Sequence, residues 1–145
     1  MRKRSLAREN ALKILYQAEM TRRDVVVTAE SYWKDSDNTD DQIKQFSDRI
    51  TSGIQKNLEA IDNKITQYAT NWQLKRMAVI DRNVLRLGVF ELLHTTDIPP
   101  KVTINEAVEL AKKYGDMESN KFVNGILDKI HKSEVVPGNK NEQAR

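Results

Sequence analysis

Basic and aromatic side chains stand next to each other at two places near the C-terminal end of this sequence. Tyr114 follows Lys112 and Lys113, and Phe122 follows Lys121. Proteins that bind single-stranded RNA use this combination, because cations hold the phosphates while aromatic faces stack on unpaired bases. The same sequence also fits two aromatic core residues with solvated lysines beside them. The pattern alone leaves both interpretations open.

A second group of cations lies at the N-terminus. Residues 1–13 contain five cations against one anion, although the whole chain carries a net charge of only +3. These cations are Arg2, Lys3, Arg4, Arg8 and Lys13. A basic arm of this kind is suited to contact with a polyanion, and a solvated, frayed terminus is the alternative.

Two further groups are candidates for a surface that binds another protein. Tyr16 and Met20 lie four residues apart in a helical pattern, either in the core or on an exposed partner surface. The segment 76–86 alternates charges and suits a solvated face or a docking face. Within it, Asp81 and Arg82 are expected at the surface.

The sequence contains none of the patterns that we sought for a catalytic or metal site. Cysteine is absent, which excludes disulfides and thiolate zinc sites. His94 and His131 are too far apart in sequence for metal-ligand spacing. Neither a glycine-rich phosphate loop nor a nucleophile elbow is present. We therefore expect a binding module without enzymatic activity, cofactor or metal.

The length and composition indicate one domain in the cytoplasm. The chain has 145 residues, of which 39% are hydrophobic and 31% are charged. It has no apolar run near the roughly 18 residues that a membrane span needs. No apolar signal segment follows the basic N-terminus. We therefore expect no membrane association.

The hydrophobic periodicity predicts an all-α protein of six to seven helices. The expected helices cover residues 5–22, 29–34, 43–68, 77–92, 103–114 and 118–130. The valines in "DVVVTAESYW" suggest a strand, but no partner strand is visible, so we expect a loop there. Thr103 and Glu106 form a capping-box pattern, and Gly115 suits a helix C-cap.

Four of these segments together resemble the NusB family of bacterial transcription antitermination factors. They read "ARENALKILYQAEM", "RMAVIDRNVLRLGVFELL", "DIPPKVTINEAVELAKKYG" and "SNKFVNGILDKI". The resemblance runs through most of residues 4–130 in the family's order, although residues 24–70 match only as a helical pattern. It implies one RNA-binding domain over residues 1–132, made of two packed helical sub-bundles at about 4–70 and 71–132. Residues 133–145 are expected to be a disordered tail.

The resemblance also implies a function and its partners. Members of this family pair with NusE, a ribosomal protein of the small subunit. The pair recognises a single-stranded boxA element in nascent RNA. It helps to assemble an antitermination complex on RNA polymerase, notably in ribosomal RNA operons. No enzymatic activity is implied.

Residues are carried over by their match to the family's motifs. The implied RNA surface consists of Arg2, Lys3, Arg4, Arg8, Tyr114, Glu118, Asn120, Lys121 and Phe122. The implied NusE-facing side consists of Tyr16, Met20, Asp81, Arg82 and Leu85. Phe122 is then expected in the first turn of the last helix, partly exposed. Gly125 is expected to let another helix come close.

Three other functions remain as alternatives. The first is a protein–protein interaction module without RNA contact. The second is a homodimeric adaptor that uses the face assigned to NusE. The third is the RNA-targeting domain found ahead of some ribosomal RNA cytosine methyltransferases, which is disfavoured because no catalytic domain follows residue 145 in this sequence.

Overall fold

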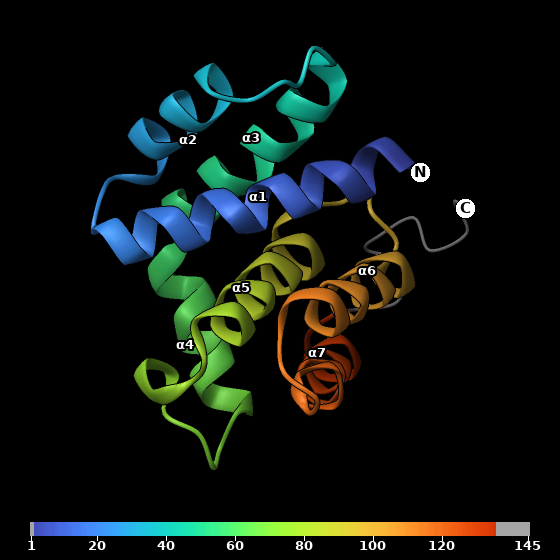
Figure 1. The fold of residues 1–145 in the computed structure, drawn as a ribbon. Helices are drawn as coiled ribbons and strands as arrows, with labels where there is room; N and C mark the ends of the chain where they lie inside the picture. The colour runs from blue at the N-terminus through green and yellow to red at the C-terminus, as the bar shows by residue number, and fades with distance from the viewer. Residues whose placement is uncertain (1, 136–145) are drawn as a thin grey trace. The chain divides into compact units, whose positions relative to one another are not determined.

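The computed structural model describes residues 2–135, which form seven α-helices and one 3-10 helix, with no strand in that range (Figure 1). The prediction of an all-α fold is therefore confirmed. The chain divides into two compact units, Met1–Lys56 and Asn57–Arg145. The sequence placed this division near residue 70, one helix later.

The first unit contains three helices, α1 (Arg2–Thr21), α2 (Val25–Lys34) and α3 (Asp41–Lys56). Each of the three packs against the other two. Their buried faces carry alanine and isoleucine side chains, together with Phe46. The alanines on α1 let neighbouring helices approach closely, because they add little bulk to its buried side.

Helix α2 begins earlier than predicted. The carboxylate of Asp24 accepts hydrogen bonds from the backbone N–H groups of Val26 and Val27 at 2.8 and 3.2 Å. It therefore caps a helix whose first turn is made of valines. The cap and packing against α1 and α3 outweigh the low helix propensity of valine, so the predicted loop over residues 25–28 was wrong.

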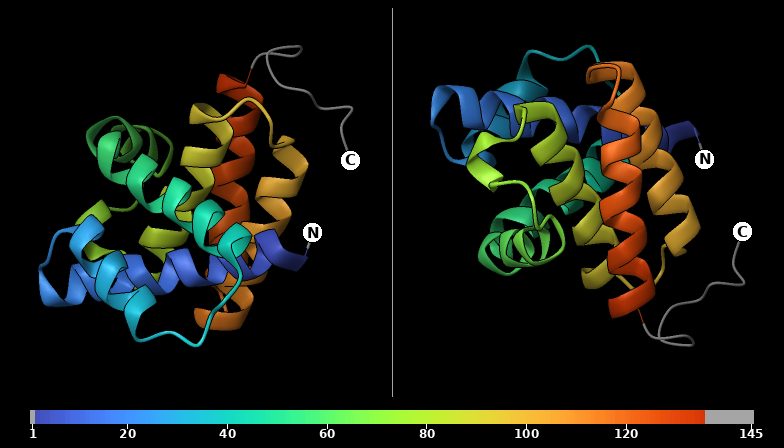
Figure 2. Two further views of the ribbon diagram at one scale, coloured as in Figure 1. Left: turned by 90° about the horizontal axis from the view of Figure 1, so that it is seen from above. Right: turned by 90° about the horizontal axis from the view of Figure 1, so that it is seen from below.

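The second unit contains α4 (Leu58–Tyr68), the 3-10 helix η1 (Leu74–Arg76), α5 (Val79–His94), α6 (Pro100–Tyr114) and α7 (Ser119–Glu134). Helices α5, α6 and α7 pack against one another, as both views of Figure 2 show. Helix α4 packs against α5 and α7. This packing explains why α4 groups with the C-terminal helices rather than with α3.

The predicted helix over residues 43–68 is two helices. The helical backbone is interrupted at Asn57, whose φ and ψ of −115° and 20° are not helical. Hydrophobic side chains continue at helical spacing across the break, including Ile54 and Ile61, so the periodicity conceals it.

Helix α6 begins three residues before the predicted capping box. Pro99 is its N-cap and Pro100 its first residue, a position where a missing N–H costs no helical hydrogen bond. Thr103 therefore lies inside the helix and does not cap it. Its hydroxyl instead donates to the buried carboxylate of Glu91 at 2.9 Å.

Helix α7 extends through Ser133 to Glu134, so the predicted tail begins too early. Glu134 is held by Lys64 Nζ at 3.0 Å and by the hydroxyl of Tyr68 at 2.5 Å. These contacts join the last turn of α7 to α4. The rest of the predicted tail, residues 136–145, lies outside the described residues.

None of the helices formed by residues 2–135 is both long enough and apolar enough to cross a membrane.

Candidate nucleic-acid interface

The predicted basic arm forms the first two turns of α1. Arg2, Lys3 and Arg4 are exposed there, whereas Arg8 is only 2% exposed. The arm is therefore helical and not a frayed end. Arg8 lies on the buried side of α1, so its guanidinium is not accessible to an RNA phosphate in this structure.

The guanidinium groups of this arm gather on one aromatic ring of α3. Arg4, Arg8 and Arg49 lie 4.4, 5.2 and 5.7 Å from the centre of the Phe46 ring. Guanidinium groups at these distances gain from the negative face of the ring. The Phe46 ring thus stabilises the guanidinium groups of α1 and α3 that lie beside it. Arg49 was not predicted, because it lies 41 residues after Arg8 in a segment without a basic pattern.

A surface hollow of about 490 Å³ lies beside this ring. Its lining residues are Lys3, Arg4, Gln42, Gln45, Phe46 and Arg49. Cations and amide groups that line one hollow are suited to phosphate and base edges.

Asp40 connects α1 to the start of α3 beside this hollow. Its carboxylate accepts from the backbone N–H groups of Gln42 and Ile43 and so caps α3. It also pairs with Lys3 Nζ at 3.0 Å. The hydrogen bond from Lys3 is the main reason why the pKa of Asp40 lies below its usual value. Lys3 is therefore oriented by α3 and remains exposed to solvent.

The aromatic part of the predicted site belongs to the second unit. Phe122 is half-buried in the first turn of α7, and Lys121 beside it is exposed. The ring of Phe122 meets the ring of Trp72 edge to face, with centroids 5.4 Å apart. Trp72 is 58% exposed. The two ring planes lie at 76°, so they offer separate faces, and the exposed ring of Trp72 adds a surface on which an unpaired base can stack.

The sequence did not identify Trp72 as a site residue. It lies in the connection between α4 and η1, where helical periodicity gives no information about its surroundings. The signal was a tryptophan in a polar connection close to Lys75 and Arg76.

The connection between α6 and α7 fixes the remaining predicted RNA residues. Tyr114 ends α6 half-buried, with Lys113 Nζ 5.5 Å from its ring centre. A Cβ on Gly115 would lie 2.4 Å from Ser119 Oγ, so only glycine fits this close turn. Glu118 is exposed and Asn120 half-buried at the start of α7. Within this unit, α6 and α7 thus carry Tyr114, Glu118, Asn120, Lys121 and Phe122 within nine residues of chain.

Two of the five residues predicted to face NusE are exposed. Tyr16 is 40% exposed and Met20 is 57% exposed, four residues apart on α1. Such large apolar side chains on one side of a helix are suited to contact with a protein.

The other three predicted partner residues are buried, which corrects the expectation that Asp81 and Arg82 lie at the surface. Asp81 and Arg82 are each 8% exposed, and Leu85 is fully buried. Arg82 donates to the backbone carbonyls of Leu74 and Met77 at 3.0 and 2.8 Å. It therefore ties η1 to α5.

Asp81 has an unusual environment. Its Oδ1 atom is buried and has no hydrogen-bond partner. Burial is the main cause that raises the pKa of this carboxyl; a hydrogen bond from Ser119 opposes the shift and the charge of Asp116 adds to it. This carboxylate is suited to a role within the second unit rather than to direct contact with a partner.

The expectation for Gly125 was also wrong. A Cβ built there meets no atom within 4 Å, so no neighbouring helix requires a glycine at this position. Gly88 in α5 has the close contact instead, because a Cβ there would lie 2.6 Å from Leu127 Cδ1.

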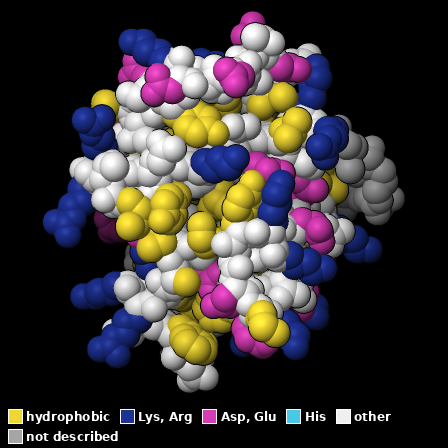
Figure 3. All heavy atoms as spheres, viewed as in Figure 1, with side chains coloured by type: hydrophobic (Ala, Val, Ile, Leu, Met, Phe, Trp, Pro, Cys, Tyr) yellow, Lys and Arg dark blue, Asp and Glu magenta, His cyan; other side chains and the backbone are white. Residues whose placement is uncertain are grey.

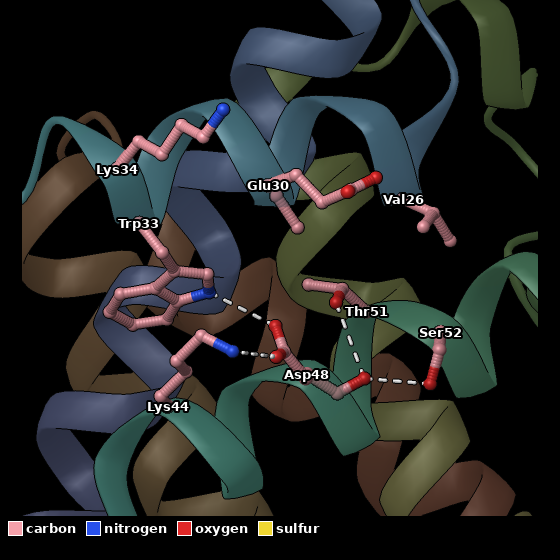
Figure 4. A pocket seen from close by; sticks show the side chains of 9 residues that line it. Val26, Glu30, Trp33, Lys34, Lys44, Asp48, Thr51 and Ser52 are labelled. Atoms are coloured by element: carbon pink, nitrogen blue, oxygen red, sulfur yellow. Dashed lines mark hydrogen bonds and ion pairs between the residues drawn. The ribbon is translucent and has the colours of Figure 1, made fainter. Parts of the chain in front are cut away.

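A second hollow in the first unit, of about 520 Å³, lies between α2 and α3 (Figure 4). Two of its polar groups contact Asp48: Trp33 Nε1 donates to Asp48 Oδ1 at 3.0 Å, and Lys44 Nζ lies 3.4 Å from Asp48 Oδ2. Both carboxylate oxygens of Asp48 are therefore engaged by neighbouring side chains.

Basic side chains do not gather in a single patch on the face of the molecule drawn in Figure 3. Figure 3 shows Lys and Arg side chains scattered over the face in view, with hydrophobic side chains exposed between them. Among residues 2–135 no group of three or more His, Asp or Glu side chains is arranged to hold a metal ion. The local groups around Phe46 and Phe122 are therefore the features best suited to bind a polyanion.

Comparison with protein families gives one match that covers most of the chain. A model of the NusB family matches residues 5–132. The transcription antitermination protein NusB of Myxococcus xanthus is 46% identical over 130 residues, which cover 88% of this chain and 93% of that protein. The corresponding protein of Desulfitobacterium hafniense is 44% identical over 131 residues, covering 90% and 88%.

Solved structures give the same result. NusB of T. maritima superposes with a TM-score of 0.86 at 42% identity, covering 94% of this chain and 95% of that one. A further match is to a structure of the antitermination factors NusB and NusE in complex with double-stranded RNA. It has a TM-score of 0.84 at 28% identity and covers 91% of this chain and 98% of that chain.

Proposed function

Because this chain belongs to the NusB family, we propose that it is a transcription antitermination factor that binds single-stranded boxA RNA together with NusE. The pair helps to assemble an antitermination complex on RNA polymerase, notably in ribosomal RNA operons. The chain acts by binding and not by catalysis. This role belongs in the cytoplasm, where bacterial RNA is transcribed.

The observation that carries the proposal is the combination of exposed cations with an aromatic pair, in which Trp72 is exposed and Phe122 is half-buried. Lys3 and Arg4 supply positive charge on the first unit, and Lys121 supplies it beside Phe122 on the second. Phosphate contacts give salt-dependent affinity, and stacking on the Trp72–Phe122 pair favours unpaired bases. On the second unit, Tyr114, Glu118 and Asn120 complete the surface around Phe122 and orient the RNA or the lysine side chains that bind it.

Arg8 takes an indirect part in this proposal. Its guanidinium lies over Phe46 and is buried, so it positions the ring against which Arg4 also packs. Arg2, Lys3 and Arg4 are the arm residues that contact phosphate.

NusE binds at the exposed side of α1 formed by Tyr16 and Met20. Asp81, Arg82 and Leu85 support the fold around η1 and α5 and affect this partner only through it. If the RNA touches both proteins, each ligand increases the affinity for the other by the same factor. A homodimer through Tyr16 and Met20 would compete with NusE, which sedimentation with and without NusE tests directly.

The experiment is fluorescence anisotropy with a short boxA RNA and a scrambled control, with and without NusE, over a salt series. We expect tighter binding to boxA, a further gain with NusE and weaker binding as salt increases. Phe122→Ala should weaken boxA binding by roughly 5- to 150-fold, since a stacked base contributes about 1–3 kcal/mol. Arg4→Ala should reduce the slope of log affinity against log salt by about 0.7.

Lys56→Ala is the charge-matched control for Arg4→Ala. Lys56 is exposed at the opposite end of α3 from Phe46, ten residues or about 15 Å along the helix. The substitution Lys56→Ala removes one positive charge from the same unit and should leave the slope of log affinity against log salt unchanged. Equal binding of boxA and scrambled RNA would reduce the function to nonspecific RNA binding. No binding even with NusE would favour a module that binds only proteins.

A further inference from the structure

Gly125 occupies a position where the fold gives no reason for a glycine. It lies in the middle of α7, it is exposed, and a Cβ built on it meets no atom within 4 Å. Glycine inside a helix is less favourable than alanine, because the unfolded chain gains more conformational freedom from it. A side chain would therefore fit here and would stabilise the helix.

Gly88, the other helical glycine of this unit, is required by close packing inside the fold. A Cβ on Gly88 would lie 2.6 and 2.9 Å from the two Cδ atoms of Leu127, so close packing inside the fold requires that glycine. Among the residues that the structure describes, no such neighbour lies at Gly125. The open backbone there is instead suited to close approach of something outside the chain.

The neighbours of Gly125 indicate what approaches it. Lys121 and Phe122 lie four and three residues earlier, on the same side of α7 and one turn away. Helical side chains lean toward the N-terminus, so a side chain at position 125 would cover the surface beside these two residues. Trp72 extends this surface, since its ring is 5.4 Å from that of Phe122 and 58% exposed.

We propose that the bare backbone at Gly125, together with Trp72, Lys121 and Phe122, forms a seat for one unpaired nucleotide of the bound RNA. The inference rests on the proposed RNA-binding function and adds Gly125 to its site. The base stacks on one ring of this edge-to-face pair while the other ring supports the first, and the ammonium of Lys121 contacts an adjacent phosphate. The sugar passes over Gly125, where any side chain would displace it.

RNA fits this surface better than a protein partner does. The exposed Lys121 and the half-buried Phe122 lie one turn from the open backbone, and the exposed Trp72 contacts Phe122, which matches the alternating phosphate and base of a single strand. A protein-binding surface would be expected to present a wider apolar patch, whereas Asn124 and Lys129 around Gly125 are exposed polar residues.

The test uses the full chain with NusE and the boxA and scrambled RNAs. Gly125→Ala should raise the melting temperature by about 3 °C, because alanine favours the helix and meets no neighbour. Gly125→Gln should stay folded and weaken boxA binding by roughly 5- to 150-fold, the range expected when one stacked base is displaced. The slope of affinity against salt should not change, because no charge is removed.

Asn63→Ala is the matched control. Asn63 is exposed in the middle of α4, in the same unit, so the substitution also improves helix propensity. It should raise the melting temperature and leave RNA affinity unchanged. This control separates an effect of helix stability from an effect of the seat.

Combination with Trp72→Ala tests whether both residues serve one nucleotide. Trp72→Ala alone should weaken binding by a similar factor. The double variant Gly125→Gln/Trp72→Ala should then bind about as well as either single variant, since one nucleotide is displaced only once. Losses that multiply would overturn the shared seat.

The other outcomes are also decisive. Unchanged boxA affinity of Gly125→Gln, while the wild-type protein prefers boxA, would overturn this inference and leave the proposed function standing. Weakened binding of NusE with RNA affinity intact would overturn it in favour of a protein contact. A wild-type protein without preference for boxA would instead contradict the proposed function itself.

Discussion

The substitution Gly88→Ala should destabilise this protein, although alanine is the better helix former. The added Cβ would lie 2.6 Å from Leu127 Cδ1, 2.9 Å from Cδ2 and 3.3 Å from Cγ. Leu127 is fully buried, so any movement of its side chain must be accommodated by the residues packed around it. Either α5 and α7 must separate or Leu127 must leave its preferred rotamer.

The size of the effect follows from two opposing contributions. Helix propensity favours alanine by about 1 kcal/mol. Overpacking of a buried contact costs about 1–3 kcal/mol. The net change in the free energy of unfolding at Gly88 is therefore a loss of about 0–2 kcal/mol. At Gly125 only the favourable contribution remains, which gives a gain of about 1 kcal/mol.

Urea denaturation of Gly88→Ala and Gly125→Ala measures this contrast directly. The two variants exchange the same residue types inside helices of one unit, so their unfolded states change in the same way. We expect their unfolding free energies to differ by about 1–3 kcal/mol. A variant Gly88→Ala/Leu127→Val should recover part of the loss, because the clashing Cδ atoms are removed. If Gly88→Ala is as stable as Gly125→Ala, the reasoning from close packing is refuted.

Two further predictions concern buried polar groups of the second unit. Thr103→Val removes the hydroxyl that donates to the buried Glu91 carboxylate and should cost about 1–3 kcal/mol of unfolding free energy. Thr103→Ser keeps the hydroxyl and should lose less than the valine variant, and equal losses in urea would contradict the role of the hydrogen bond. Asp81→Asn should stabilise the protein near neutral pH, because it removes a buried negative charge whose Oδ1 has no partner. The folded-state pKa of Asp81 is raised, so its protonation favours the fold, and the stability of the wild type relative to Asp81→Asn should fall as pH rises from about 3 to 7. A difference that stays constant over this range would contradict the burial of the charge.

The helices were largely predictable because their buried faces repeat at the helical period. The pattern located α1, α5, α6 and α7 to within a few residues. It failed where local chemistry overrides it. The carboxylate of Asp24 starts α2 among valines, and Asn57 divides α3 from α4 although the apolar spacing continues.

The candidate site was predictable only in part, since sequence gives residue type and not exposure. Phe122 next to Lys121 could be identified from spacing, and the structure leaves Phe122 half-buried and Lys121 exposed. Arg82 could not be assigned correctly, because its charge suggests the surface. In the fold its guanidinium satisfies two backbone carbonyls around η1. A charged residue that satisfies buried carbonyls has the same sequence signature as one in solvent.

The two helical glycines of the second unit, Gly88 and Gly125, look alike in the sequence but differ in their packing. Each lowers helix propensity by a similar amount, so the sequence cannot tell them apart. At Gly88 the cost is offset inside the fold by the close contact with Leu127. At Gly125 nothing in the described chain offsets it. A gain in stability on substitution, combined with a loss of RNA affinity, would mean that the compensating contact forms only in the complex.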